Sequence, residues 1–97
     1  MATKVLRTIG GMDELEALTM TYGVAYRHLQ TQGVSTPSHI DCDLVISEYR
    51  HSHQGKVIGA VSEWLCDSKA WVGKEDDRRY KLTRRAYLAV KKGDGVA

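Results

Sequence analysis

Apolar side chains recur at spacings of three and four residues between positions 13 and 33, and they are Leu15, Leu18, Tyr22, Tyr26 and Leu29. This spacing places them on one face of an α-helix, which turns once about every 3.6 residues. Asp13 and Glu16 have the spacing of a capping box, which starts a helix, and Gly33 can adopt the left-handed conformation that ends one. We therefore expect a helix from about Asp13 to Gly33 that buries one face.

The length of 97 residues and the hydrophobic content of 42% support one small domain with a thin core. No internal repeat divides the chain, so we expect a single domain over 1–97, with an N-terminal arm at 1–11 and a frayed tail at 93–97. No apolar run approaches the roughly 20 residues of a membrane span, and residues 1–11 lack the apolar centre of a secretory signal. We therefore expect a cytoplasmic protein with no membrane partner, in which Cys42 and Cys66 are reduced core thiols.

The residue pattern of the segment 39–46 fits either a β-strand or a short α-helix. Its apolar residues alternate with polar ones, as in a half-buried strand, and they are Ile40, Cys42, Leu44 and Ile46. Asp41 or Asp43 could equally cap a short helix that carries Leu44, Val45 and Tyr49, so periodicity leaves both alternatives open. Helical spacing returns after a polar break, and we expect a second helix from about His53 to Ser68 with Ser52 as its cap.

Strand-forming and turn-forming residues follow in the segment 71–82. Trp71 and Val72 favour a strand, "GKEDD" has the composition of a turn, and "RRYKL" alternates basic with apolar side chains. This pattern predicts a β-hairpin with a charged tip. Thr83 can cap a last helix, whose expected core residues are Leu82, Ala86, Ala89 and Val90.

The charge is distributed unevenly along the chain. Residues 1–50 hold four Lys and Arg against six Asp and Glu, whereas residues 51–97 hold ten against six. The net charge of +2 is therefore the sum of an acidic first half and a basic second half, and the basic residues of the second half are concentrated between Lys74 and Lys92. Such a patch attracts polyanions even when the whole chain is nearly neutral.

The order of helices and hairpin, and the segment "RRYKLTRRAYLAV" in particular, resemble the winged helix-turn-helix DNA-binding domains of bacterial, archaeal and viral regulators. The resemblance covers roughly residues 39–92, with the helix after Asp13 as the family's first helix. It implies an α+β, mainly helical fold, in which a C-terminal β-hairpin wing precedes a final helix. It also implies a DNA-binding transcriptional regulator.

In such a domain the second helix of the motif lies in the major groove of double-stranded DNA and the wing contacts the backbone. The expected groove residues are His53, Gln54 and Lys56, because Gln pairs with adenine and Lys with guanine or phosphate. Gly59 and Ala60 would permit close approach to the bases, or would equally serve helix packing. The expected phosphate contacts are Lys74, Arg78, Arg79, Lys81, Arg84 and Arg85.

Intramolecular pairing offers another interpretation of the wing. Arg78 and Arg79 can pair with Glu75, Asp76 or Asp77 across the turn, and such pairing would weaken the basic patch.

The sequence contains no pattern that predicts catalysis. It lacks a glycine-rich phosphate loop, a serine elbow and a nucleophile beside a base. His39, Cys42, His51 and His53 do not complete a usual zinc spacing. We therefore expect a protein that is not an enzyme, with no cofactor and no metal ion.

Two further partners follow from the same residues. A winged helix can also bind another protein, so a polymerase, a replication factor or a host regulator is the alternative to DNA. A homodimer is a second hypothesis, because two recognition helices on one DNA face increase specificity. Its interface would come from Tyr22, Tyr26 and Leu29 or from the last helix.

Overall fold

The computed structural model describes residues 8–9, 11–52, 55–65, 74 and 77–93. Two short strands, β1 (Thr8–Ile9) and β2 (Met12–Asp13), pair antiparallel around Gly11. Within these ranges four helices follow, and they are α1 (Glu14–Thr31), α2 (His39–Ser52), α3 (Lys56–Trp64) and α5 (Arg78–Lys91).

The expected first helix is confirmed as α1. Leu18, Tyr22 and Tyr26 are buried on its inner face. Asp13 precedes the helix, but its side chain makes no capping hydrogen bond. The helix ends as expected at Gly33, whose φ of +100° is left-handed. The Gly33 N–H donates to the Gln30 carbonyl and the Val34 N–H to the Leu29 carbonyl, both at 3.0 Å, which satisfies two carbonyls of the last turn.

The open question at 39–46 is answered by α2, which is helical throughout. Ser38 and Asp41 cap its start reciprocally: the Asp41 N–H donates to Ser38 Oγ and the Ser38 N–H donates to Asp41 Oδ2, each at 3.1 Å. Cys42, Ile46 and Tyr49 are buried at helical spacing, so the cysteine is a core thiol as expected. Cys66 lies outside the described residues.

The second expected helix is present, but it begins later than predicted. Ser52 is the last residue of α2 and not a cap, and α3 begins at Lys56 after Gly55, whose φ is +139°. The inner face of α3 carries Ile58 and Val61, and the buried Leu65 follows at its C-cap. Ser68, where we expected this helix to end, lies outside the part of the chain that the structure describes.

The predicted β-hairpin wing is wrong, because "RRYKL" forms the first turns of α5. Asp77 caps this helix, and its side chain accepts a hydrogen bond of 2.8 Å from the Arg79 N–H. Thr83 is therefore inside the helix and fully buried, and it is not the cap that we expected. Trp71 and Val72, the expected first arm of the hairpin, lie outside the described residues.

The winged helix-turn-helix fold is consequently not the fold of this chain. The described residues are mainly helical, and β1 and β2 are their only strand pair. Because the second arm of the hairpin is helical, no wing can form there.

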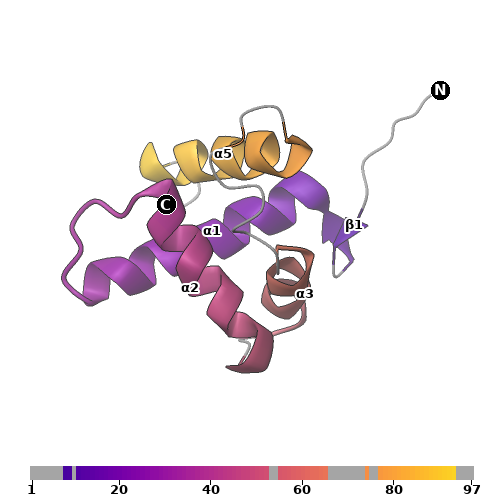
Figure 1. The fold of residues 1–97 in the computed structure, drawn as a ribbon, viewed down its shortest axis with the longest axis horizontal. Coiled ribbons are helices and arrows are strands. Elements are labelled where there is room, and N and C mark those ends of the chain that lie inside the picture. The colour runs from indigo at the N-terminus through magenta and orange to yellow at the C-terminus, as the bar shows by residue number, and fades with distance from the viewer. Residues whose placement is uncertain (1–7, 10, 53–54, 66–73, 75–76, 94–97) are drawn as a thin grey trace.

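Figure 1 shows α1 at the centre of the molecule, with α5 running along it and α2 crossing it. The α1 and α5 helices run in the same direction, since Glu14 meets Arg78 near their starts and Tyr26 meets Tyr87 further along. The α3 helix packs against α2 and α1. The core between these helices is formed by Ala17, Leu18, Tyr22, Ala25, Tyr26, Cys42, Ile46, Val61, Leu65, Ala86, Tyr87 and Val90.

Candidate functional site

Of the predicted groove-reading residues, Lys56 alone lies in the part of the chain that the structure describes. His53 and Gln54 lie outside the described residues, and Lys56 is exposed at the first position of the helix. Gly59 and Ala60 are half-buried, and Ala60 packs against the core. The packing interpretation therefore holds for Ala60, and α3 contributes little to a polar binding surface.

Arg78, one of the predicted phosphate contacts, forms an ion pair with a carboxylate of α1. Its Nη2 donates to Glu14 Oε1 at 2.7 Å and its Nη1 donates to Glu14 Oε2 at 3.4 Å. The Glu14 side chain is fully buried, whereas the Arg78 side chain is 54% exposed. Arg78 therefore neutralises a buried carboxylate, and this pairing offsets its positive charge on the surface.

Arg79 also has an acidic partner. Its Nη2 lies 3.3 Å from Asp77 Oδ2, the residue that caps α5. Hydrogen bonding from the Arg79 side chain lowers the pKa of Asp77 below its ordinary value. The intramolecular pairing that we considered for the wing thus occurs for Arg79 with Asp77, whereas Arg78 pairs with Glu14 of α1, a partner that the sequence did not indicate. Lys74 is exposed just before this turn.

The two surfaces of the DNA-binding hypothesis are also separated in space. In Figure 1, α1 lies between α5 and α3. Lys56 at the start of α3 and the basic residues of α5 therefore do not form the continuous reading surface that the winged-helix resemblance implied.

The outer side of α5 carries a row of cations, which we call the basic ridge and define as Lys81, Arg85 and Lys92. Residues spaced by four and seven positions lie on the same side of a helix, and all three are exposed. None of them forms an ion pair with a described residue. The sequence contains no Asp or Glu between residues 78 and 92, so no carboxylate interrupts the ridge within α5.

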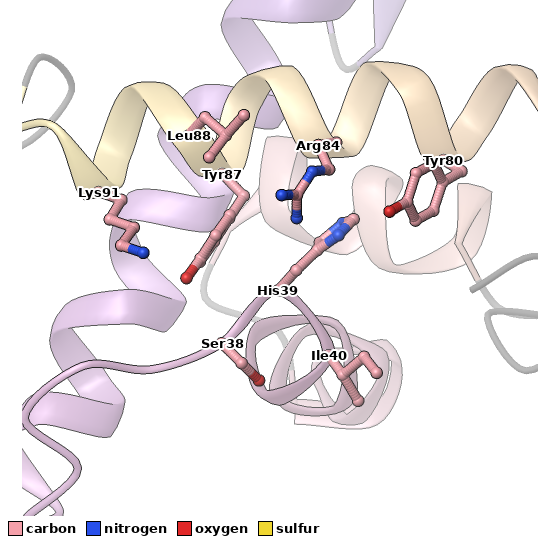
Figure 2. Close-up of a pocket in the computed structure, with 8 residues that line it drawn as sticks. All are labelled: Ser38, His39, Ile40, Tyr80, Arg84, Tyr87, Leu88 and Lys91. Atoms are coloured by element: carbon pink, nitrogen blue, oxygen red, sulfur yellow. The ribbon is translucent and has the colours of Figure 1, made fainter. Parts of the chain in front are cut away.

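A pocket of about 320 Å³ opens between α5 and the start of α2, and we call it the α2–α5 pocket. Its lining residues are Ser38, His39, Ile40, Tyr80, Arg84, Tyr87, Leu88 and Lys91. Figure 2 shows the side chains of Arg84 and Lys91 directed from α5 toward the first turn of α2. Arg84, which we predicted to contact DNA, is thus part of the pocket rim and not of the basic ridge.

The floor of the pocket is aromatic. The His39 ring lies between Tyr80 and Tyr87, with ring centroids 5.4 Å and 5.5 Å away, and it stacks on Tyr87. The Tyr87 hydroxyl donates to the Pro37 carbonyl at 2.7 Å, which fixes the loop before α2 against α5. The walls of the pocket are therefore held rigidly by hydrogen bonding and ring packing.

His39 is hydrogen-bonded to α5. Its Nε2 lies 2.9 Å from the Thr83 hydroxyl oxygen, which also lies 3.2 Å from the Tyr80 carbonyl oxygen. Burial, and to a smaller extent the charge of Arg84, lower the pKa of His39 to about 4. The histidine is consequently neutral at pH 7, and the positive charge of the pocket comes from Arg84 and Lys91.

Asp43 lies beneath the pocket in a buried polar cluster. Its Oδ1 accepts a hydrogen bond from the Tyr22 hydroxyl, while its Oδ2 has no hydrogen-bond partner. Burial raises the pKa of Asp43 to about 7, although the Tyr22 hydrogen bond acts in the opposite direction. This carboxyl therefore changes its charge near neutral pH inside the core.

Thr83, His39 and Asp43 are residue types of a hydrolytic triad, but their geometry is not that of one. Asp43 Oδ2 lies 3.8 Å from Nε2, the same nitrogen that Thr83 contacts, so it does not orient the opposite side of the ring. Thr83 is also fully buried inside α5. The cluster is better explained as a set of structural contacts that joins α1, α2 and α5.

The pocket was missed in the sequence because its two walls are distant in the chain. His39 and Thr83 are separated by 44 residues. One local signal was present: Ser38 and Asp41 have the spacing of a capping box, which would have placed the start of α2 at the pocket.

Within the described residues, no three His, Cys, Asp or Glu side chains gather in a way that could hold a metal ion. No described helix is both long and apolar enough to span a bilayer. Tyr22 and Tyr26, which we considered for a dimer interface, are buried in the core of the chain itself.

No protein-family model matches this chain, and neither does any curated protein or any solved structure.

Proposed function

We propose that this protein binds the phosphate backbone of double-stranded DNA through the basic ridge of α5, without reading the base sequence. The observation that carries the proposal is the row of exposed cations formed by Lys81 and Arg85 on α5 and Lys92 at its C-cap, which contains no carboxylate. Exposed cations displace the ions condensed on a nucleic acid, and this release favours binding. We place this activity in the cytoplasm.

The dimensions of the ridge suit a duplex. Lys81 and Lys92 are eleven residues apart, which corresponds to about 16 Å at a rise of about 1.5 Å per residue. The charges on duplex DNA repeat about every 1.7 Å along its axis, so the ridge spans several phosphates. The three ridge cations are exposed, so they can contact about three phosphates.

The described residues of α5 and α3 offer few polar side chains that could read a base sequence. Specific recognition needs polar side chains that reach the base edges while cations hold the backbone. The ridge contains only lysine and arginine, and the half-buried Gly59 and Ala60 leave α3 with little polar surface. Binding should therefore depend on salt much more than on base sequence.

The test is fluorescence anisotropy of a labelled mixed-sequence duplex over a series from about 50 to 300 mM salt. The logarithm of the association constant should fall linearly with the logarithm of salt concentration, with a slope of about −0.9 for each phosphate contacted. The triple variant Lys81→Gln, Arg85→Gln, Lys92→Gln should bind more weakly and reduce the slope by about 2 to 3.

Lys56→Gln is the matched control, because Lys56 is an exposed lysine on α3 and outside the ridge. It should leave both affinity and slope nearly unchanged. Absence of binding at about 50 mM salt, or equal losses in the triple variant and the control, would reject the proposal.

A further inference from the structure

Three large aliphatic side chains remain exposed around the α2–α5 pocket. Ile40 is 51% exposed, Leu44 47% and Leu88 39%. Ile40 and Leu88 both line the pocket, and Leu44 lies one turn after Ile40 on the same face of α2. A DNA backbone offers no apolar group that would cover these side chains. A clustered apolar surface beside a polar rim is typical of a protein-binding site.

The rim of this apolar surface is positively charged. Arg84 and Lys91 reach over the pocket from α5, as Figure 2 shows, and neither forms an ion pair with a described residue. The start of α2 adds the partial positive charge of a helix N-terminus. Asp41 is the nearby carboxylate on α2, and its Oδ2 is engaged by the Ser38 N–H. The pocket therefore favours a ligand that carries negative charge.

We propose that the α2–α5 pocket binds a short acidic segment of another protein, with one large apolar side chain inserted beside Ile40 and Leu88. The cavity of about 320 Å³ has room for one leucine or aromatic side chain. Carboxylates on either side of this anchor pair with Arg84 and Lys91, which gives the charge-assisted contacts that surround an apolar anchor in protein interfaces.

The spacing of the two cations defines the spacing of the acidic residues. Arg84 and Lys91 are seven residues apart, or about 10 Å along α5. An extended peptide covers this distance in about three residues. The binding segment should therefore contain two acidic residues about three positions apart, with the apolar anchor between or beside them.

Charge also distinguishes this partner from a second copy of the chain. In a twofold-symmetric dimer the same surface patch faces itself, so Arg84 and Lys91 would approach the Arg84 and Lys91 of the other copy. Such like charges repel. The proposal is independent of DNA binding, because the basic ridge uses Lys81, Arg85 and Lys92 on the outer side of α5.

The experiment selects a random twelve-residue displayed peptide library on the full-length protein. The enriched peptides should share one large apolar residue with two Asp or Glu about three positions apart. Their affinities are then measured by fluorescence anisotropy with labelled synthetic copies. The double variant Arg84→Gln, Lys91→Gln should weaken binding at least about tenfold, and Ile40→Ser, Leu88→Ser should do the same.

The ridge variant Lys81→Gln, Arg85→Gln, Lys92→Gln is the matched control, since it removes even more positive charge from α5 but leaves the pocket intact. It should change peptide affinity by less than about threefold, which separates a pocket from general charge attraction. Circular dichroism melting of every variant verifies that the exposed substitutions leave the fold intact.

Several results would overturn the inference. They are a selection without an acidic and apolar consensus, an equal loss of affinity in the ridge and pocket variants, and insensitivity to the pocket variants. Sedimentation that shows a dimer dissociated by Ile40→Ser, Leu88→Ser would assign the surface to a second copy. Loss of duplex DNA binding in the pocket variants, together with no selected peptide, would assign the pocket to nucleic acid.

Discussion

Glu14 is fully buried at the start of α1, and both of its carboxylate oxygens accept hydrogen bonds from Arg78. A buried carboxylate without a partner is costly, because the protein interior cannot replace the hydration that the charge has lost. About half of the Arg78 side chain is exposed, so water screens part of its attraction to Glu14 and reduces the free energy that the ion pair contributes.

We expect Arg78→Ala to lower the free energy of unfolding by about 2 kcal/mol, because it leaves Glu14 buried without its counter-ion. Urea denaturation followed by circular dichroism measures this change. Arg85→Ala on the same helix is the control and should stay within about 0.5 kcal/mol, since Arg85 is exposed. Adding Glu14→Gln to Arg78→Ala should recover part of the loss. A double variant as unstable as Arg78→Ala alone would contradict the explanation.

Asp43 and His39 contribute opposite pH dependences to stability. Burial raises the pKa of Asp43 from 3.8 to about 7, so the folded state binds the Asp43 proton more tightly than the unfolded chain does. The contribution of Asp43 to the free energy of unfolding therefore falls as the pH rises from about 4 to 7. Burial lowers the pKa of His39 from 6.5 to about 4, so its contribution rises between those values. The two slopes oppose each other between about pH 4 and 6.5.

Between about pH 4 and 6.5 the two contributions nearly cancel, so we expect the free energy of unfolding of the wild-type protein to change little. As the pH rises further to about 7, this free energy should fall. Asp43→Asn removes the falling contribution, so its stability should rise by up to about 3 kcal/mol between about pH 4 and 6.5, where folded His39 is neutral and the unfolded chain still binds the proton. Thermal melts at a series of pH values measure both profiles. Parallel profiles for the two proteins would show that Asp43 does not titrate in this range.

At the scale of elements, α5 shows why a short sequence window misled the prediction. Over five residues, "RRYKL" alternates basic and apolar side chains as a strand does. Over fourteen residues the buried positions are Thr83, Ala86, Tyr87 and Val90, which are spaced by three, one and three and so follow a helix. The cap at Asp77 then starts the helix before the alternating segment.

The other helices could be predicted from the sequence where the local pattern of apolar and capping residues was long and clear. The α1 helix has a long apolar repeat and a glycine stop, and both were found. The apolar repeat of α2 is short enough to fit two structures, and packing against α3 and α1 decides for the helix. The basic residues of α5 were found from charge alone, but the pairing of Arg78 with Glu14 depends on chain segments 64 residues apart.

Gly33 ends α1 in the left-handed conformation, with a φ of +100°. A Cβ at this position would meet no atom within 4 Å, so a substitution is opposed by backbone conformation and not by a clash. We expect Gly33→Ala to destabilise the protein by about 1 kcal/mol, measured by urea denaturation. Gly33→Asn should cost less, because asparagine tolerates the left-handed region better. Equal losses for both variants would indicate a cause other than backbone conformation.

At the scale of the whole molecule, α5 completes the core that α1 begins. It supplies Ala86, Tyr87 and Val90 to the core and Arg78 to the buried Glu14. A chain ending at residue 77 should therefore lose its cooperative thermal transition, because the inner face of α1 would be exposed to water. Circular dichroism and differential scanning calorimetry measure this loss.

A chain ending at residue 93 is the control, since it retains every element that the structure describes. It should melt cooperatively, close to the full-length protein. A cooperative transition in the chain ending at residue 77 would mean that α1, α2 and α3 form a stable core without α5.

The pairing of α1 with α5 also affects how the chain acquires its structure during translation. Glu14 is synthesised 64 residues before Arg78. At about 5 to 20 residues per second, this interval lasts roughly 3 to 13 s. Until it ends, the apolar stripe of the first helix lacks its last covering element, and any part of it that has left the ribosome is open to chaperones.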